Sequence, residues 1–280
     1  MTNLRKSWLA GIQALSLVMC LQLYGLALQT QAAVAADQPT VLVTGANRGL
    51  GLVWTQQYAA RGWNVIATAR QPVEAAELNE LAKQTGRVRI EQLDATDAKS
   101  VDALGNRLAG QPIDILINNV GVLGDEEEQR LGSLAADRFD YYMRTNALSA
   151  LLVTERLLPN IRAGKLKKIA GISAVVASFA VYPRIHSGLY YYKASKVALN
   201  MIMRNIAMDT QRDGIAVAVL SPGVVNTYGT ESNREAMSPE MMRSMVDINT
   251  SVAGMIKVMD QLTLDGSGRW YRYSGDTIEW

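Results

Sequence analysis

The strongest constraint on the fold of this chain is a regular alternation of short apolar runs with longer helical patterns from Pro39 onward. Runs rich in β-branched residues predict strands, and strands that alternate with helices form a parallel sheet covered on both faces. We therefore predict one Rossmann-type, doubly wound α/β domain over residues 37–280. The predicted strands are Val41 to Thr44, Trp63 to Thr68, Val88 to Leu93, Ile113 to Asn118, Lys168 to Ser173, Ile215 to Ser221 and Arg269 to Tyr273.

Two of the predicted helices are long, Asp137 to Arg162 and Leu189 to Arg212. Pro159 and Gly164 mark the end of the first. The segment 228–249 interrupts the alternation and is rich in methionine, which is more often helix core, although soft side chains beside a pocket would suit an adaptable substrate lid. Its methionines are Met237, Met241, Met242 and Met245.

Residues 1–36 have the three-part layout of a secretory signal peptide: basic residues, an apolar stretch from Trp8 to Leu28, and small residues. Cleavage after Ala35 or Ala36 removes this leader, whereas retention leaves it as a single membrane anchor. Either way the globular part lies on the periplasmic or extracellular side. Arg5-Lys6 also makes an imperfect twin-arginine signal, and a leader without function leaves the protein in the cytoplasm.

Composition excludes several classes of protein. The formal charge is +2, with basic and acidic residues interspersed, so no basic patch for nucleic acid is expected. One cysteine, Cys20, and one histidine, His186, exclude a disulfide framework, a Cys/His zinc site and a Cys-His dyad. We predict no metal site, and we interpret the acidic run Asp125 to Glu128 as a solvated loop.

A glycine-rich turn follows the first predicted strand, with the spacing T-G-x-x-x-G-x-G from Thr44 to Gly51. Glycines permit a tight turn and let the backbone approach a pyrophosphate, and the next helix supplies amide donors and a positive dipole end. Because a strand precedes this turn and a helix follows it, the context favours a dinucleotide site over a chance turn.

Charge near the turn predicts which nicotinamide cofactor binds. NAD binding favours an acidic residue at the end of the second strand. Here that strand ends at Arg70 without a carboxylate, and Arg48 lies in the glycine turn. Two guanidinium groups match a 2′-phosphate in charge and in forked hydrogen bonding. The sequence therefore predicts NADP(H), the alternative being two solvated surface arginines.

Six motifs, in one order, resemble the short-chain dehydrogenase/reductase family from Thr40 to the end of the chain. The segment 269–280 and the Asn47-Arg48 version of the turn further resemble the C-factor and sniffer-like carbonyl reductases. Besides the glycine turn, the motifs are Asp94, Asn118-Asn119-Val120-Gly121, Asn146, Tyr192-Lys193-Ala194-Ser195-Lys196 and Pro222-Gly223-Val224-Val225-Asn226-Thr227.

The resemblance implies a cofactor site at the carboxyl ends of the strands. It places Asp94 at the adenine, Asn118 and Gly121 along the adenosine, and Thr227 at the nicotinamide carboxamide. Asp94 could instead be a turn or cap residue, and Asn118-Asn119 could hold a strand end together. The predicted cofactor-binding residues are Thr44, Gly45, Asn47, Arg48, Gly49, Leu50, Gly51, Arg70, Asp94, Ala95, Asn118, Gly121, Tyr192, Lys196, Pro222, Gly223, Val225 and Thr227.

Tyr192 and Lys196 are the predicted catalytic pair. They lie four residues apart in a predicted helix, so both side chains share one face. A phenol has a pKa of about 10, and we expect the neighbouring ammonium to lower it. The resemblance implies that Tyr192 gives its proton to a carbonyl oxygen, that Lys196 also holds the nicotinamide ribose, and that Asn146 anchors a water. Taken alone, the run Tyr190 to Tyr192 would suit aromatic packing.

The sequence departs from the family pattern at the serine that polarises the substrate carbonyl. Aligned on the usual I-S-S pattern, that position is Ala174. The candidate substitutes are Ser173, which strand alternation points to the opposite face, and Ser178, which lies past the strand. Losing a positioned donor costs roughly a hundred- to a thousandfold in rate. We therefore expect a slow or substrate-restricted enzyme.

The sequence thus predicts an NADP(H)-dependent oxidoreductase that reduces a small carbonyl compound or oxidises the corresponding alcohol. The alternative, motivated by Ala174, is a dinucleotide-binding sensor or scaffold with little or no turnover. The expected partners are a small-molecule substrate and, as in many relatives, a second copy in a homodimer or homotetramer. Contact with a membrane is expected only if the leader is retained.

Mass spectrometry of protein from its native host, in a gently prepared extracytoplasmic fraction, tests the leader and the cofactor together. Because NADPH is a cytoplasmic metabolite, an exported enzyme carries it bound or uses another cofactor, unless the leader has no function. We expect a mature N-terminus at Ala36 or Asp37 with NADP(H) attached. An intact leader on protein confined to the cytoplasm would contradict export.

Overall fold

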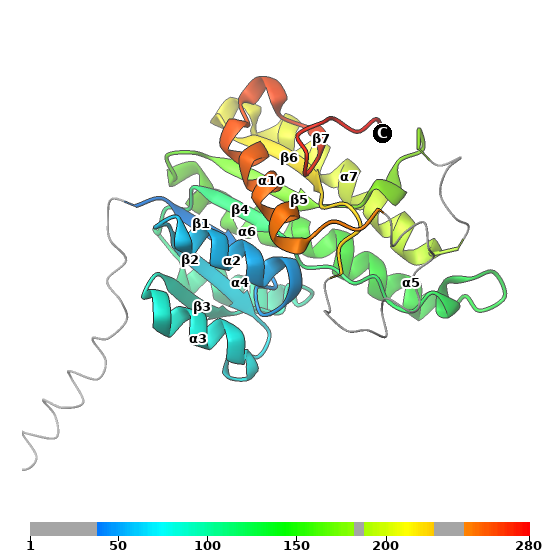
Figure 1. Ribbon diagram of the computed structural model, residues 1–280, viewed down its shortest axis with the longest axis horizontal. Coiled ribbons are helices and arrows are strands. Elements are labelled where there is room, and N and C mark those ends of the chain that lie inside the picture. The colour runs from blue at the N-terminus through cyan, green and yellow to red at the C-terminus, as the bar shows by residue number, and fades with distance from the viewer. Residues whose placement is uncertain (1–37, 182–187, 227–243) are drawn as a thin grey trace, which may run out of the picture. The chain divides into compact units, whose positions relative to one another are not determined.

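Seven parallel strands form one sheet in the order β3-β2-β1-β4-β5-β6-β7 in the computed structural model, which describes residues 38–181, 188–226 and 244–280 (Figure 1). Each predicted strand is present, and its ends differ from the prediction by no more than two residues. The strands are β1 (Thr40–Val43), β2 (Asn64–Ala69), β3 (Val88–Gln92), β4 (Ile115–Asn118), β5 (Lys168–Ile172), β6 (Ala216–Ser221) and β7 (Arg269–Arg272).

Helices cover both faces of the sheet (Figure 1). One face carries α2 (Gly49–Ala60), α3 (Ala76–Thr85) and α10 (Ile248–Gln261), and the other carries α4 (Ala98–Arg107), α6 (Ser149–Ala163) and α7 (Tyr190–Thr210). The short helix α5 (Ala136–Met143) packs against α7. This is the doubly wound arrangement predicted from the sequence, and Gln38–Trp280 form one compact unit.

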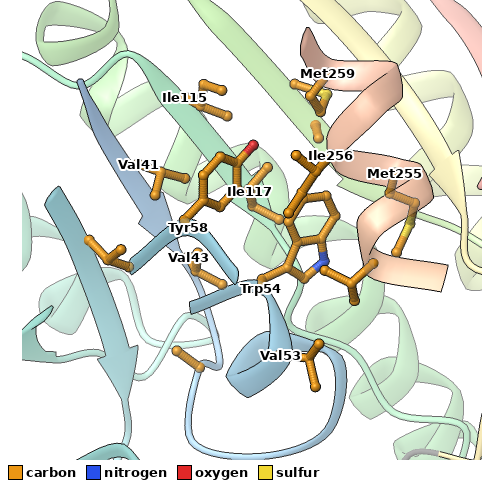
Figure 2. Packing of buried hydrophobic residues seen from close by; sticks show 14 of the residues in the cluster. Val41, Val43, Val53, Trp54, Tyr58, Ile115, Ile117, Met255, Ile256 and Met259 are labelled. Atoms are coloured by element: carbon orange, nitrogen blue, oxygen red, sulfur yellow. The ribbon is translucent and has the colours of Figure 1, made fainter. Parts of the chain in front are cut away.

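Alternating strand residues feed two separate cores. Leu42 of β1 faces the core beneath α4, α6 and α7, whereas Val41 and Val43 face the core beneath α2 and α10. In the second core, the fully buried rings of Trp54 and Tyr58 stack with centroids 5.8 Å apart (Figure 2). Each such ring buries about 150–250 Å². Their packing fixes α2, and with it the first turn of that helix, against the sheet.

The predicted helix from Asp137 to Arg162 is wrong as a single α-helix. A five-residue π-helical turn, Arg144–Leu148, separates α5 from α6. Such turns widen the helix locally and are frequent at functional sites. The helical segment ends at Ala163, before Gly164, as predicted, whereas the prediction that Pro159 marks its end is wrong, because α6 continues through it. A Cβ at Gly164 would lie 2.2 Å from the carbonyl oxygen of Ile113, so glycine is required there.

Several predictions fall outside the described residues. These are the leader, three methionines of the segment 228–249 (Met237, Met241 and Met242), and Thr227. Met245 is described, and it forms a parallel bridge with Val224. Within the described parts of the chain, no helix has the length and apolar character needed to span a bilayer.

Candidate active site

The glycine turn between β1 and α2 has a backbone that favours glycine. Gly45 and Gly49 have φ angles of +63° and +54°. A Cβ at Gly51 would lie 2.1 Å from the carbonyl oxygen of Gly45, so α2 packs directly on the turn. Arg48 gives α2 no side-chain cap, and the first turn of the helix carries no acidic residue. The amides and positive dipole end of α2 therefore suit an anionic group such as a pyrophosphate.

Asn119, which follows β4, holds the glycine turn in place. Its Nδ2 donates to the carbonyl oxygens of Thr44 and Gly45 at 2.9 and 3.2 Å, and its backbone N–H donates to Thr44 Oγ1 at 2.9 Å. Thr44 Oγ1 donates in turn to the Ile117 carbonyl at 3.3 Å. Asn119 was not among the predicted site residues, although its place in the N-N-V-G motif marked it. Asn119 therefore holds the end of β4 in place, as the alternative interpretation of Asn118-Asn119 predicts.

Arg48 and Arg70, the predicted 2′-phosphate ligands, are both exposed. Asp94 lies within electrostatic reach of Arg70. Partial burial raises the pKa of Asp94, but hydrogen bonds from Thr96 and the charge of Arg70 outweigh it and keep that pKa below its usual value. Asp94 Oδ1 accepts from the N–H and the hydroxyl of Thr96 at 2.9 and 2.7 Å. Asp94 therefore stabilises its own turn, whatever it also contacts in a ligand.

The predicted adenosine-side residues divide into buried and accessible ones. Asn118 is buried, and its Nδ2 donates to Thr154 Oγ1 of α6 at 2.9 Å. Its Nδ2 thus ties the end of β4 to α6, as the alternative interpretation holds, while its Oδ1 has no hydrogen-bond partner among the described residues, and its place along the adenosine stays a prediction. Ala95 is buried as well, whereas Asn47 and Gly121 are exposed.

Tyr192 and Lys196 lie on one face of α7, with Lys196 Nζ 5.7 Å from the centroid of the Tyr192 ring. Burial raises the pKa of Tyr192 to about 12 and lowers the pKa of Lys196 to about 8. The predicted lowering of the phenol pKa is therefore wrong for this structure. Desolvation dominates the phenol, and the ammonium donates instead to the carbonyl oxygen of Ile172 at 2.8 Å.

Asn146 lies in the π-helical turn and joins the loop after β4 to α7. Its Oδ1 accepts from the Val122 N–H at 2.7 Å, and its Nδ2 donates to the Val122 carbonyl and to Ser195 Oγ, each at 2.9 Å. Ser195 Oγ donates to the Tyr192 carbonyl at 2.8 Å. Asn146 thus supports the backbone of Tyr192, and its anchoring of a water stays a prediction.

Gly121 lies where these groups meet. A Cβ there would be 3.1 Å from Lys196 Nζ and 3.2 Å from Asn146 Oδ1. The missing side chain lets the ammonium and the amide approach the backbone that follows Asn119. Residues 119–122 therefore connect the glycine turn to the Tyr192–Lys196 pair at one edge of the sheet.

The region after β5 offers no serine at the expected position. Ala174 is half-buried, and Ser173 is buried with no hydrogen-bond partner for its Oγ among the described residues. Ser178 Oγ donates to the Glu279 carbonyl at 2.6 Å and accepts from the Val181 N–H at 3.2 Å. The prediction that Ser178 substitutes for the missing serine is wrong, because its hydroxyl is hydrogen-bonded to Glu279 and joins the C-terminal segment to this loop.

The end of β6 supplies the last predicted cofactor residues. Pro222 is buried, and its carbonyl accepts from Ser251 Oγ of α10 at 2.7 Å. Gly223 has a φ of +80°, and Val225 is half-buried. In the part of the chain that the structure describes, no group of three or more His, Cys, Asp or Glu side chains could hold a metal ion.

Comparison with known proteins decides the family. The model of the short chain dehydrogenase family matches residues 39–238. The chain belongs to this family. It is 32% identical to C-signal of Myxococcus xanthus over 178 residues. This alignment covers 64% of this chain and 99% of C-signal. The resemblance predicted from the six motifs is therefore confirmed, and the protein is an oxidoreductase of this family.

Solved structures agree with this assignment. The NADPH-bound carbonyl reductase from chicken fatty liver is 30% identical with a TM-score of 0.77, covering 87% of this chain and 99% of that one. The carbonyl reductase Sniffer of D. melanogaster has a TM-score of 0.74 at 23% identity over 87% of this chain and 100% of that one, which shows the shared fold.

Proposed function

We propose that this protein reduces a small carbonyl compound, or oxidises the corresponding alcohol, with NADP(H) as hydride carrier and Tyr192 as proton donor. One observation carries this proposal: Tyr192 and Lys196 share a face of α7, and Lys196 meets Gly121 on the segment that clamps the glycine turn. When bound, NADPH supplies a hydride for the carbonyl carbon. The carbonyl reductase from chicken fatty liver, solved with NADPH, supports the assignment.

The chain's own groups handle the proton. With a pKa of about 12, Tyr192 keeps its proton on Oη at neutral pH and can donate it to a carbonyl oxygen. Lys196, with a pKa of about 8, is largely an ammonium at neutral pH and stabilises the phenolate that this donation leaves. Ser195 and Asn146 hold the backbone that carries the phenol.

The residues present fit NADP(H) rather than NAD. An uncapped helix start without acidic residues suits the pyrophosphate, and the Gly51 contact leaves no room for a side chain between turn and helix. Arg48 and Arg70 would hold the 2′-phosphate, since no carboxylate ends β2 to accept from ribose hydroxyls.

Replacing Arg48 or Arg70 with alanine should weaken NADPH binding selectively. A hydrogen bond to a charged group is worth about 1.5–3 kcal/mol, so each variant should raise the Kd for NADPH roughly 10- to 100-fold. Fluorescence titration with NADPH and NADH measures this. Arg61→Ala, at the other end of α2, is the matched control. An equal loss for both nucleotides would contradict the 2′-phosphate assignment.

Tyr192→Phe should remove most turnover and spare cofactor binding. A positioned general acid contributes about 10²–10⁴-fold, and phenylalanine keeps the ring without the proton. Steady-state reduction of a panel of aldehydes, ketones and quinones gives the rate, and NADPH fluorescence gives the affinity. Tyr190→Phe, an exposed neighbour in the same run, controls for the change of residue type. Undiminished turnover in Tyr192→Phe rules out the assigned proton donor.

A second candidate function is a dinucleotide-binding sensor or scaffold. Ala174 favours it, because this position has no hydroxyl to polarise a carbonyl, and the hydroxyl of Ser178 is bonded to Glu279. Binding of NADPH without reduction of any compound in the panel would support this candidate.

Ala174→Ser separates the two candidates. In an enzyme limited by the missing donor, the restored hydroxyl should raise kcat by up to about a hundred- to a thousandfold. Ser173→Ala removes the unpartnered neighbouring hydroxyl, and a fall in kcat in this variant would identify Ser173 as the substitute donor. An active wild type that Ala174→Ser does not accelerate uses another donor, and two inactive proteins favour the sensor.

We also propose that the leader exports the domain and that the protein forms a homodimer or homotetramer through its two longest helical segments. Leu151 of α6 and Met201 and Met208 of α7 are exposed apolar side chains that support such pairing. A monomeric mass in solution would contradict the assembly.

A further inference from the structure

The helix that carries Tyr192 and Lys196 has no cap of its own. It begins at Tyr190, and Leu189 before it has left-handed backbone angles, φ 53° and ψ 40°, and makes no side-chain cap hydrogen bond. The first amides of a helix have no partners within the helix. The start of α7, including the N–H of Tyr192, therefore depends on acceptors from elsewhere in the fold.

Gln129 supplies that acceptor from the loop between β4 and α5. Its side chain is fully buried, and its Oε1 accepts from the backbone N–H of Tyr192 at 2.8 Å. Its Nε2 donates to the carbonyl oxygens of Leu123 and Asp125 at 2.9 and 3.0 Å. One amide thus joins the loop after β4 to the first turn of α7.

A chain of hydrogen bonds sets the orientation of this amide. Arg138 donates twice to Glu128, at 2.8 and 2.7 Å, and hydrogen bonds from Arg138 and Tyr142 lower the pKa of Glu128. The ionised Glu128 can only accept, so Tyr142 Oη donates to it, at 2.6 Å. Tyr142 Oη lies 3.2 Å from Gln129 Nε2 and shares its two N–H groups with the Leu123 and Asp125 carbonyls, so three acceptors face this nitrogen. Gln129 must therefore turn its oxygen toward Tyr192. Asp125, Glu126 and Glu127 are exposed, in line with the interpretation of this run as a solvated loop, and Glu128 is half-buried against Arg138 and Tyr142.

A second contact joins the same two segments. Tyr191 Oη accepts from the backbone N–H of Ala135 at 2.5 Å, and its buried ring lies 5.4 Å from that of Tyr142 and 6.2 Å from that of Phe139. The loop and α5 therefore hold the residues on either side of the Tyr191–Tyr192 peptide bond.

We propose that Gln129 is a positioning residue for Tyr192, which sets where α7 begins and so where the phenol meets the substrate. The proposal rests on the function proposed above. Gln129 touches no reacting atom, because its contact is with the Tyr192 backbone. Displacing a reacting group by about 1 Å can cost on the order of 10²-fold in rate.

Gln129→Met tests the proposal, because methionine keeps the length and apolar bulk of the side chain but removes the acceptor and the donors. We expect kcat to fall about 10- to 100-fold while the Kd for NADPH stays unchanged. Asn160→Leu is the matched control. Asn160 is also a buried amide that donates to two carbonyls, those of Leu108 and Gln111, but it lies beside the start of β4, where its own carbonyl accepts from the Ile113 N–H. The Asn160→Leu variant should have a lower free energy of unfolding and an unchanged kcat.

Two measurements separate positioning from simple loss of stability. Burial holds the pKa of Lys196 at about 8 and that of Tyr192 at about 12, so the alkaline limb of the reductive pH profile should lie near 8, where the Lys196 ammonium loses its proton. Loosening the first turn of α7 should expose the pair and move this limb upward, toward 10.0. Amide hydrogen exchange at Tyr192 should also speed up in Gln129→Met and not in Asn160→Leu. If Gln129→Met does not fold, Gln129→Asn, one methylene too short to reach both sides, should show the same changes.

The outcomes are distinct. An active wild type with unchanged kcat and pH profile in a folded Gln129 variant overturns this inference alone. Equal losses of kcat in the Gln129 and Asn160 variants also overturn it, because they indicate general destabilisation. A wild type without turnover overturns the proposed function, and this inference with it.

Discussion

The clamp that Asn119 makes on the turn after β1 is the interaction on which the rest of the site depends. β1 and β4 are neighbours at the point where the strand order reverses, and open parallel sheets bind ligands at this point. One side-chain amide spans the gap there by donating to the Thr44 and Gly45 carbonyls. The same loop continues through Gly121, which meets Lys196 and Asn146. One short segment, residues 119–122, therefore holds both the glycine turn and the Tyr192–Lys196 pair.

Burial, more than charge pairing, governs the protonation of that pair. Desolvation disfavours the charged form of each group, so the pKa of Tyr192 rises and that of Lys196 falls. Spacing alone predicted the opposite shift for the phenol, since two groups one helical turn apart can interact directly. Lys196 instead donates to the Ile172 carbonyl of β5. A protonated phenol is the form that reduction of a carbonyl requires.

Regular and local features were predictable. The seven strands follow from runs of β-branched residues, and the glycine turn follows from the spacing Thr44 to Gly51, because both patterns reflect neighbours in the chain. The π-helical turn at Arg144–Leu148 was not predictable from the sequence, since its residues fit an α-helical pattern equally well. The bond of Ser178 to Glu279 was also missed, because about a hundred residues separate the two. Gln129 carried no signal, as its partners come from four separate positions.

The sequence by itself determined the architecture, the family and the residues that we propose bind a dinucleotide and exchange a proton. These depend on periodicity, on glycine conformation and on residue type, all of which are properties of short segments. Only the tertiary structure decided which side chains remain available to a ligand. Hydrogen bonds between distant residues engage the Nδ2 of Asn118 with α6, Ser178 with the C-terminal segment and Gln129 with the start of α7. A buried polar atom takes the partner that folding brings to it, and that partner is invisible in the order of the residues.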